Sequence, residues 1–139
     1  MRSDAAPRVD VPRRDQVEFY FADIDSLIPE EHPVRIVDAA ARRIDLSELY
    51  EAMRAREGGP GRPNIDPRLM LALWVYAILR DVGSARALDE LCKKHLAYRW
   101  LCGGVSVNHH TLADFRSERA GLFERLLIEQ WHGCARRDW

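Results

Sequence analysis

The sequence predicts an all-α fold: an irregular bundle of about six helices, with a helix-turn-helix-like portion and no sheet. Apolar residues recur at intervals of three and four along most of the 139-residue chain, which is the spacing of one helix face. No segment shows the sustained apolar–polar alternation of a half-buried strand. Capping and breaking residues divide the periodic stretches into segments of ordinary helix length.

The first two helices are expected over residues 34–56. Apolar residues recur every three or four positions from Val34 onward, which defines one buried face. Asp45 is expected to cap the second helix, with Glu48 as its capping-box partner. A Gly/Pro-rich loop over residues 57–65 ends this pair.

A long helix is expected over residues 67–80, where the sequence is apolar nearly all round. Such a helix is normally surrounded by others, so we predict that it is the central helix of the domain. Asp66 is a suitable N-cap, with Pro67 at the first helical position. Gly83 fits the C-terminal stop of this helix, and Ser84 fits the next N-cap.

Three more helical segments are expected after this turn. The first of these helices follows Ser84, and Asp89 is among its residues that are expected to point away from the apolar face. A short helical turn comes next and ends at a two-glycine turn. Asn108 is a good N-cap for the following helix, and a last helix is expected over residues 120–131. The apolar face of the first segment consists of Leu88, Leu91, Cys92 and His95.

These helices are predicted to form one domain over residues 17–131. Residues 1–16 are rich in Arg, Asp and Pro and are expected to be a flexible tail, and residues 132–139 are expected to be an irregular tail. The aromatic stretch over residues 17–21 is expected to dock on the helical body. Within the domain, the helices of residues 66–119 form a compact group.

Charge is distributed unevenly although the net charge is only −1. Residues 1–61 carry nine bases against thirteen acids, whereas residues 62–119 carry nine bases against six acids. This asymmetry favours an anionic partner for the second half. It is small, and an ordinary mixed solvated surface is the alternative.

Cysteine usage and hydropathy favour a cytoplasmic protein without a membrane partner. Three Cys with no C-x-x-C pair fit a reducing compartment. The N-terminus has no apolar signal region, and the longest apolar run, residues 69–79, is about half of the ~20 residues that a bilayer span needs. A zinc site and a Cys–His nucleophile are conceivable, but the spacing is unlike that of structural zinc sites and no acid orients a nucleophile, so we predict no metal and no cofactor. The residues considered for these sites are Cys92, His95, Cys102, His109 and His110.

The helix that begins at Asn108 is the candidate DNA-contacting element. A helix of about 10–12 Å diameter fits the major groove, and its first turns reach base edges. The helices of residues 66–119 are therefore predicted to bind DNA. Arg116 and Arg119, expected off the apolar face, could meet phosphates, while Lys93, Lys94 and Arg99 could flank the duplex and Arg62 could enter a minor groove. For each of these, a plain solvated residue is the alternative. The residues that we expect to contact DNA are Arg86, His109, His110, Thr111, Arg116 and Arg119.

Four aromatic residues could in principle stack on bases. Because they lie at helical spacing beside Leu and Ile, we expect them in the core instead. They are Trp74, Tyr76, Tyr98 and Trp100.

Three stretches stand out together and in this order: LIPEEHPVRIVDAAARRIDLSELY (27–50), GRPNIDPRLMLALWVYAILRDVGSARALDELCKKHLAYRWLCGG (61–104) and NHHTLADFRSER (108–119). Taken together, they resemble the N-terminal domain of bacterial insertion-sequence transposases of the InsH-like, DDE-type group. The resemblance covers roughly residues 17–127 and departs at Asn108, where the family often has Asp. It implies binding to the terminal repeats of an element, in double-stranded DNA.

The resemblance also implies a separate catalytic domain, in which three carboxylates hold two divalent metals. We expect the present chain to lack that domain and to have no nuclease or strand-transfer activity. The ending WHGCARRDW fits no continuation of the helical pattern, so we consider a truncated or frameshifted transposase. Two alternatives to DNA binding are an interaction module, in which residues 34–56 dimerise with a full-length transposase or with another copy of the chain, and an inert remnant.

Overall fold

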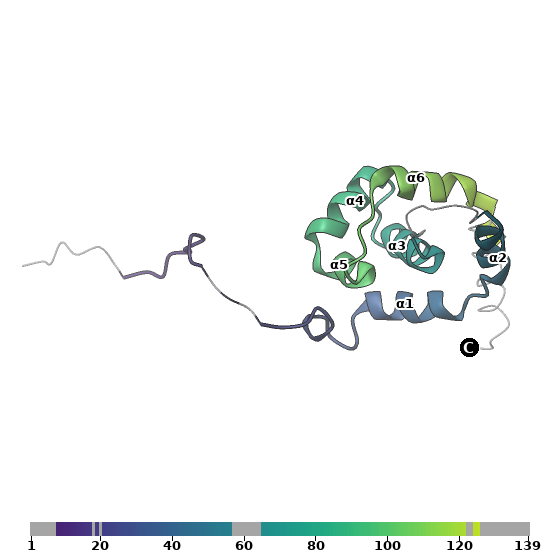
Figure 1. The fold of residues 1–139 in the computed structure, drawn as a ribbon. Coiled ribbons are helices and arrows are strands. Elements are labelled where there is room, and N and C mark those ends of the chain that lie inside the picture. The colour runs from purple at the N-terminus through teal and green to yellow at the C-terminus, as the bar shows by residue number, and fades with distance from the viewer. Residues whose placement is uncertain (1–7, 18, 20, 57–64, 122–123, 126–139) are drawn as a thin grey trace, which may run out of the picture.

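The computed structural model describes residues 8–17, 19, 21–56, 65–121 and 124–125. In these residues it has no strand, and the all-α prediction is confirmed (Figure 1). Residues 120, 121, 124 and 125 are also helical, and the rest of the expected last helix lies outside the described residues. The elements are the 3-10 helix η1 (Asp25–Leu27) and the α-helices α1 (Pro33–Arg43), α2 (Ser47–Arg56), α3 (Pro67–Leu79), α4 (Ala85–Lys94), α5 (Leu96–Cys102) and α6 (His109–Glu118).

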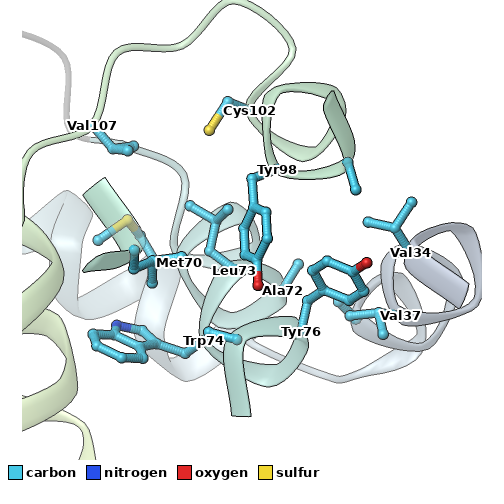
Figure 2. Packing of buried hydrophobic residues seen from close by; sticks show 14 of the residues in the cluster. Val34, Val37, Met70, Ala72, Leu73, Trp74, Tyr76, Tyr98, Cys102 and Val107 are labelled. Atoms are coloured by element: carbon cyan, nitrogen blue, oxygen red, sulfur yellow. The ribbon is translucent and has the colours of Figure 1, made fainter. Parts of the chain in front are cut away.

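Helix α3 is the central helix, as its apolar sequence predicts. The other five α-helices surround it (Figure 1), and α1, α5 and α6 pack directly against it. Most of its buried residues form the main core together with Val34 and Val37 of α1 and Tyr98 of α5 (Figure 2). Leu112 of α6 belongs to the same core. The expectation that the aromatic residues belong to the core is confirmed for Trp74, Tyr76 and Tyr98, which are all buried, whereas Trp100 is half-buried.

Local capping explains where the helices begin. The Asp66 carboxylate accepts the Arg68 amide at 3.0 Å, and the Asn108 side chain accepts the Thr111 amide at 2.9 Å. Ser84 caps α4 in the same way. Each of these bonds satisfies one of the amides that lack a partner in the first turn of a helix, so these caps are confirmed.

The turn between α3 and α4 differs from the prediction. The left-handed residue is Asp81, at φ 61°, and Gly83 does not have a positive φ. Helix α3 therefore ends through Asp81, a residue type that tolerates this conformation because its short polar side chain fits there. Gly83 instead contributes its carbonyl oxygen, which binds Arg116.

Two expectations about α4 are wrong. His95 does not extend its apolar face: it lies between α4 and α5, where its Nδ1 accepts the Ala97 amide at 3.2 Å and caps α5. Asp89 does not point to solvent, since only 6% of it is exposed. Both side chains serve a neighbouring helix, a role that the periodicity of α4 alone does not indicate.

The N-terminal segment does not dock on the helical body, so this prediction is wrong. Its described part before η1 has no helix or strand and extends away from the helices (Figure 1). Val17, Phe19 and Phe21 are 87%, 93% and 107% exposed. Helix α1 instead contacts η1 and the residues after it, because Arg35 donates to the carbonyls of Asp25, Ile28 and Pro29.

Several predicted features lie outside the described residues. They include most of the Gly/Pro-rich loop, with Arg62, and the expected tail over residues 132–139. Within the described part of the chain, no helix is both long enough and apolar enough to cross a membrane.

Candidate nucleic-acid interface

Helices α4 and α6 lie side by side and run in opposite directions. The start of α6 meets the middle of α4, because the His109 amide donates to Asp89 at 3.1 Å. The end of α6 meets the residue before α4, because the Arg116 guanidinium donates to the Gly83 carbonyl at 2.6 Å. The first half of α4 therefore lies along α6.

Basic side chains from both helices gather at the edge where α4 lies along α6. On α4, Arg86, Asp89 and Lys93 share one side, since positions three and four apart on a helix are neighbours. On α6, His109 and Arg116 are seven residues apart and share the side that faces α4. His110, the next residue on α6, is exposed to solvent. We call Arg86, Lys93, His109, His110 and Arg116 the α4–α6 surface.

Trp74 of α3 contacts α6 from the side of the core and holds it in place. Its buried indole Nε1 donates to the Leu112 carbonyl at 3.0 Å. The guanidinium of Arg116 lies 4.9 Å from the centre of the Trp74 rings, a cation–π contact. Arg116 remains exposed and has further N–H donors, because a guanidinium carries five. Arg116 therefore positions α6 and can still meet an anion.

Asp89 is the one charged residue in the buried class among the described residues. One carboxylate oxygen accepts the His109 amide and lies 3.3 Å from His109 Nδ1. The other oxygen is buried without a hydrogen-bond partner among the described residues, and it lies 3.2 Å from the Lys93 ammonium as an ion pair. Burial raises the pKa of the Asp89 carboxyl, but the attraction of Lys93 and the hydrogen bonds from His109 outweigh burial and leave this pKa below its ordinary value. The carboxylate is therefore ionised at neutral pH.

The imidazoles of His109 and His110 lie against each other, with centroids 4.1 Å apart and planes inclined by 36°. His109 is half-buried beside Asp89, whereas His110 is exposed. The two rings form a flat, polar end to α6 beside the α4–α6 edge. They can offer hydrogen-bond donors or acceptors to a ligand.

Thr111 and Arg119 face a groove beside α6, although Arg119 follows Arg116 by only three positions. They line a groove of about 410 Å³ between α2, α3 and α6. The groove also contains the carboxylates of Asp114 and Glu118 and the apolar side chains of Leu49, Met53 and Phe115. Arg119 thus lines this groove together with Phe115. Contacts place His109 and Arg116 beside α4 and the His110 ring against His109. Arg86 lies three residues before Asp89 on α4.

The basic residues of α4 and α5 differ in whether they form ion pairs with acidic side chains. Lys94 is paired with Glu90 at 2.8 Å, much as Lys93 is paired with Asp89. Arg86 and Arg99 are exposed, and neither forms an ion pair or a side-chain hydrogen bond with another residue that the structure describes. An exposed arginine without a protein partner keeps its hydrogen-bonding capacity for an anion such as phosphate.

Sequence reasoning missed Asp89 and the role of Trp74. Asp89 directly follows the fully buried Leu88 on α4, so it borders the apolar face, and a carboxylate in that position was a usable signal of a buried polar contact. The partner of each residue is distant in sequence, 20 positions away for Asp89 and 38 for Trp74. No cluster of three His, Cys, Asp or Glu that could hold a metal occurs in the part of the chain that the structure describes.

Comparison with known families gives one match. The family model described as Transposase domain (DUF772) matches residues 22–118, which include all six α-helices described above. The chain therefore belongs to this transposase-domain family. No curated protein and no solved structure matches the chain.

Proposed function

We propose that this chain is the DNA-binding N-terminal region of an insertion-sequence transposase and that it recognises the terminal DNA of its element. The observation that carries the proposal is the α4–α6 surface, on which basic side chains from two helices line one exposed edge. Membership of a transposase-domain family supports a DNA partner. Chromosomal DNA as partner would place the protein in the cytoplasm, at the nucleoid.

The α4–α6 surface suits the two kinds of contact that DNA recognition needs. Arg86 and Arg116 are exposed at the α3–α4 turn and can meet phosphates, which fix the register of a protein on the duplex. His109 and His110 lie in the first turn of α6, the part of a recognition helix that reaches base edges. The acids that lie with Thr111 and Arg119 in the α2–α6 groove make that side a poorer match for a polyanion.

The test is a mobility-shift titration with the terminal repeats of the nearest related element. The chain should bind these repeats more tightly than it binds a scrambled duplex of the same length. A base-reading contact contributes about 1–3 kcal/mol of discrimination, so the preference should be about tenfold or more. Equal affinity for both duplexes would contradict end recognition, and no shift at all would contradict DNA binding.

Single alanine variants test which residues of the α4–α6 surface contact DNA. His110→Ala should reduce the preference for terminal repeats, and Arg116→Ala should weaken binding to both duplexes, because phosphate contacts carry no sequence information. Arg43→Ala is the matched control, since Arg43 is exposed on α1, which packs on α3 and α5 rather than on α4 or α6. Thr111 and Arg119 remain predicted contacts, and alanine variants of both belong in the same series.

In this proposal the 139-residue chain binds DNA but does not cut or join it. In the transposases that the sequence resembles, cutting depends on three carboxylates that hold two divalent metals. The proposal predicts no cleavage when the purified chain is incubated with Mg²⁺ or Mn²⁺ and a terminal-repeat substrate. Cleavage above a protein-free control would contradict it.

A second candidate function is association with another copy of the chain or with a full-length transposase. It would use residues 34–56, and the observation that favours it is Ile36 on α1, a large apolar side chain that is 66% exposed. Exposed apolar groups can mark interaction surfaces. Light scattering of Ile36→Ser beside the unmodified chain tests this: a dimer that the substitution dissociates supports it, and a monomer at all concentrations contradicts self-association.

A further inference from the structure

We infer that Asp89 is a positioning residue for the proposed DNA contact, because it fixes which nitrogen of His109 carries the proton and which faces outward. The inference rests on the proposed function for its DNA part. Its structural part, the state of the His109 ring, can be measured in the protein without DNA.

The first step is the chemistry of the Asp89 carboxylate. An ionised carboxylate only accepts hydrogen bonds, so a ring nitrogen bound to it must be the donor. His109 Nδ1 is the nitrogen that lies 3.3 Å from the carboxylate. The neutral ring is therefore held as the Nδ1–H tautomer, which leaves Nε2 as an acceptor. In water a free histidine has no such constraint.

The second step is rigidity. The same carboxylate oxygen accepts the His109 backbone amide at 3.1 Å, so ring and backbone are held at one point. The Lys93 ammonium holds the other oxygen at 3.2 Å, and the His110 ring covers one face of the His109 ring. A carboxylate at the N-terminus of α6 is also favoured by the helix dipole. The ring therefore has one defined orientation before any ligand arrives.

The third step is what the outward nitrogen can do. When the ring is neutral, Nε2 accepts, and the base edges that donate in the major groove are the amino groups of adenine and cytosine. The charged groups that face the ring are Asp89 and Lys93 from α4, and His110 is its titratable neighbour on α6.

The expected behaviour is a preference for terminal repeats over a scrambled duplex that depends on Asp89. In the wild-type chain the Nε2 acceptor is held in one place, where it can read the amino group of a base. Asp89→Asn removes the negative acceptor, so the ring is no longer held in one tautomer, and the preference for terminal repeats should fall.

The test combines nitrogen NMR of the imidazole rings with DNA titrations. In the free wild-type protein at pH 8, His109 should show the Nδ1–H pattern. In Asp89→Asn it should show a larger Nε2–H population, and the preference for terminal repeats at pH 8 should fall at least about fivefold, the lower range of one base contact. Glu90→Gln is the matched control, because Glu90 is paired with Lys94 at the same four-residue spacing and lies away from His109. It should change neither readout.

The outcomes separate the two claims. A His109 ring in the Nε2–H state in the wild-type protein overturns the inference and needs no variant, so a variant that fails to fold does not affect it. The expected tautomer with an unchanged DNA preference in Asp89→Asn also overturns the positioning role. The expected tautomer in a chain that binds no DNA contradicts the proposed function and, with it, the DNA part of the inference, while the Asp89–His109 pairing stands.

Discussion

The Trp74→Phe substitution tests whether α6 is held in place from the core. Trp74 is 1% exposed, donates to the Leu112 carbonyl and supports the Arg116 guanidinium. Phenylalanine keeps an aromatic ring but removes the donor and leaves part of the site empty. The substitution thus separates what this indole contributes from what any large apolar residue would contribute.

The magnitude follows from three losses. The buried hydrogen bond contributes about 0.5–1.5 kcal/mol, and the cation–π contact about 0.5–1 kcal/mol because Arg116 is exposed. The unfilled volume costs about 1 kcal/mol more, a fraction of the 3–5 kcal/mol for complete truncation of a buried tryptophan. Together the free energy of unfolding should fall by about 2–3.5 kcal/mol, a large part of the 5–15 kcal/mol that a domain typically has.

Trp100→Phe is the matched control. Trp100 also donates its Nε1–H to an acceptor, Asp25, at 2.9 Å, and also lies beneath an arginine, with Arg35 5.0 Å from its ring centre. It is only half-buried, so its replacement should cost about 1 kcal/mol or less. Urea denaturation followed by circular dichroism gives both values. Equal losses for the two variants, or a loss below about 0.5 kcal/mol for Trp74→Phe, would refute the reasoning.

Two more predictions concern the α3–α4 turn and the buried carboxylate. Asp81→Gly should raise the free energy of unfolding by about 0.5–1 kcal/mol, because the left-handed φ of 61° costs a glycine nothing. Urea denaturation measures this free energy, and a decrease in it would contradict the assignment of strain to Asp81. The folded-state pKa of Asp89 is below the ordinary value of 3.8, so its stabilising contribution is present above that value and is lost as the pH falls through the folded-state pKa. The stability difference between the wild type and Asp89→Asn should therefore shrink between pH 5 and pH 2, and a difference that stays constant would contradict this role.

The fold could be predicted from local signals because most of its boundaries are local. Asp66 and Asn108 cap helices through bonds to residues two or three positions away, and the apolar run of α3 needs no partner to indicate burial. The turn after α3 was harder, because two candidates for the left-handed position, Asp81 and Gly83, lie two residues apart and glycine is the commoner choice.

The candidate site could be predicted only in part. Placing the contact residues on α6 and at the start of α4 needed the cap at Asn108 and the turn at Ser84, which the sequence shows. Which of them share a surface depends on how α6 is rotated against its neighbours, and that rotation is set by long-range contacts such as Trp74 with Leu112 and Asp89 with His109.

The salt dependence of DNA affinity tests the central claim most directly. The logarithm of the binding constant falls linearly with the logarithm of salt concentration, with a slope of about −0.9 for each phosphate that a protein neutralises on duplex DNA. For terminal-repeat DNA, Arg86→Ala/Arg116→Ala should make this slope shallower by about 2, while Arg43→Ala should leave it unchanged. An unchanged slope in the double variant, or an equal change in Arg43→Ala, would contradict DNA binding through the α4–α6 surface.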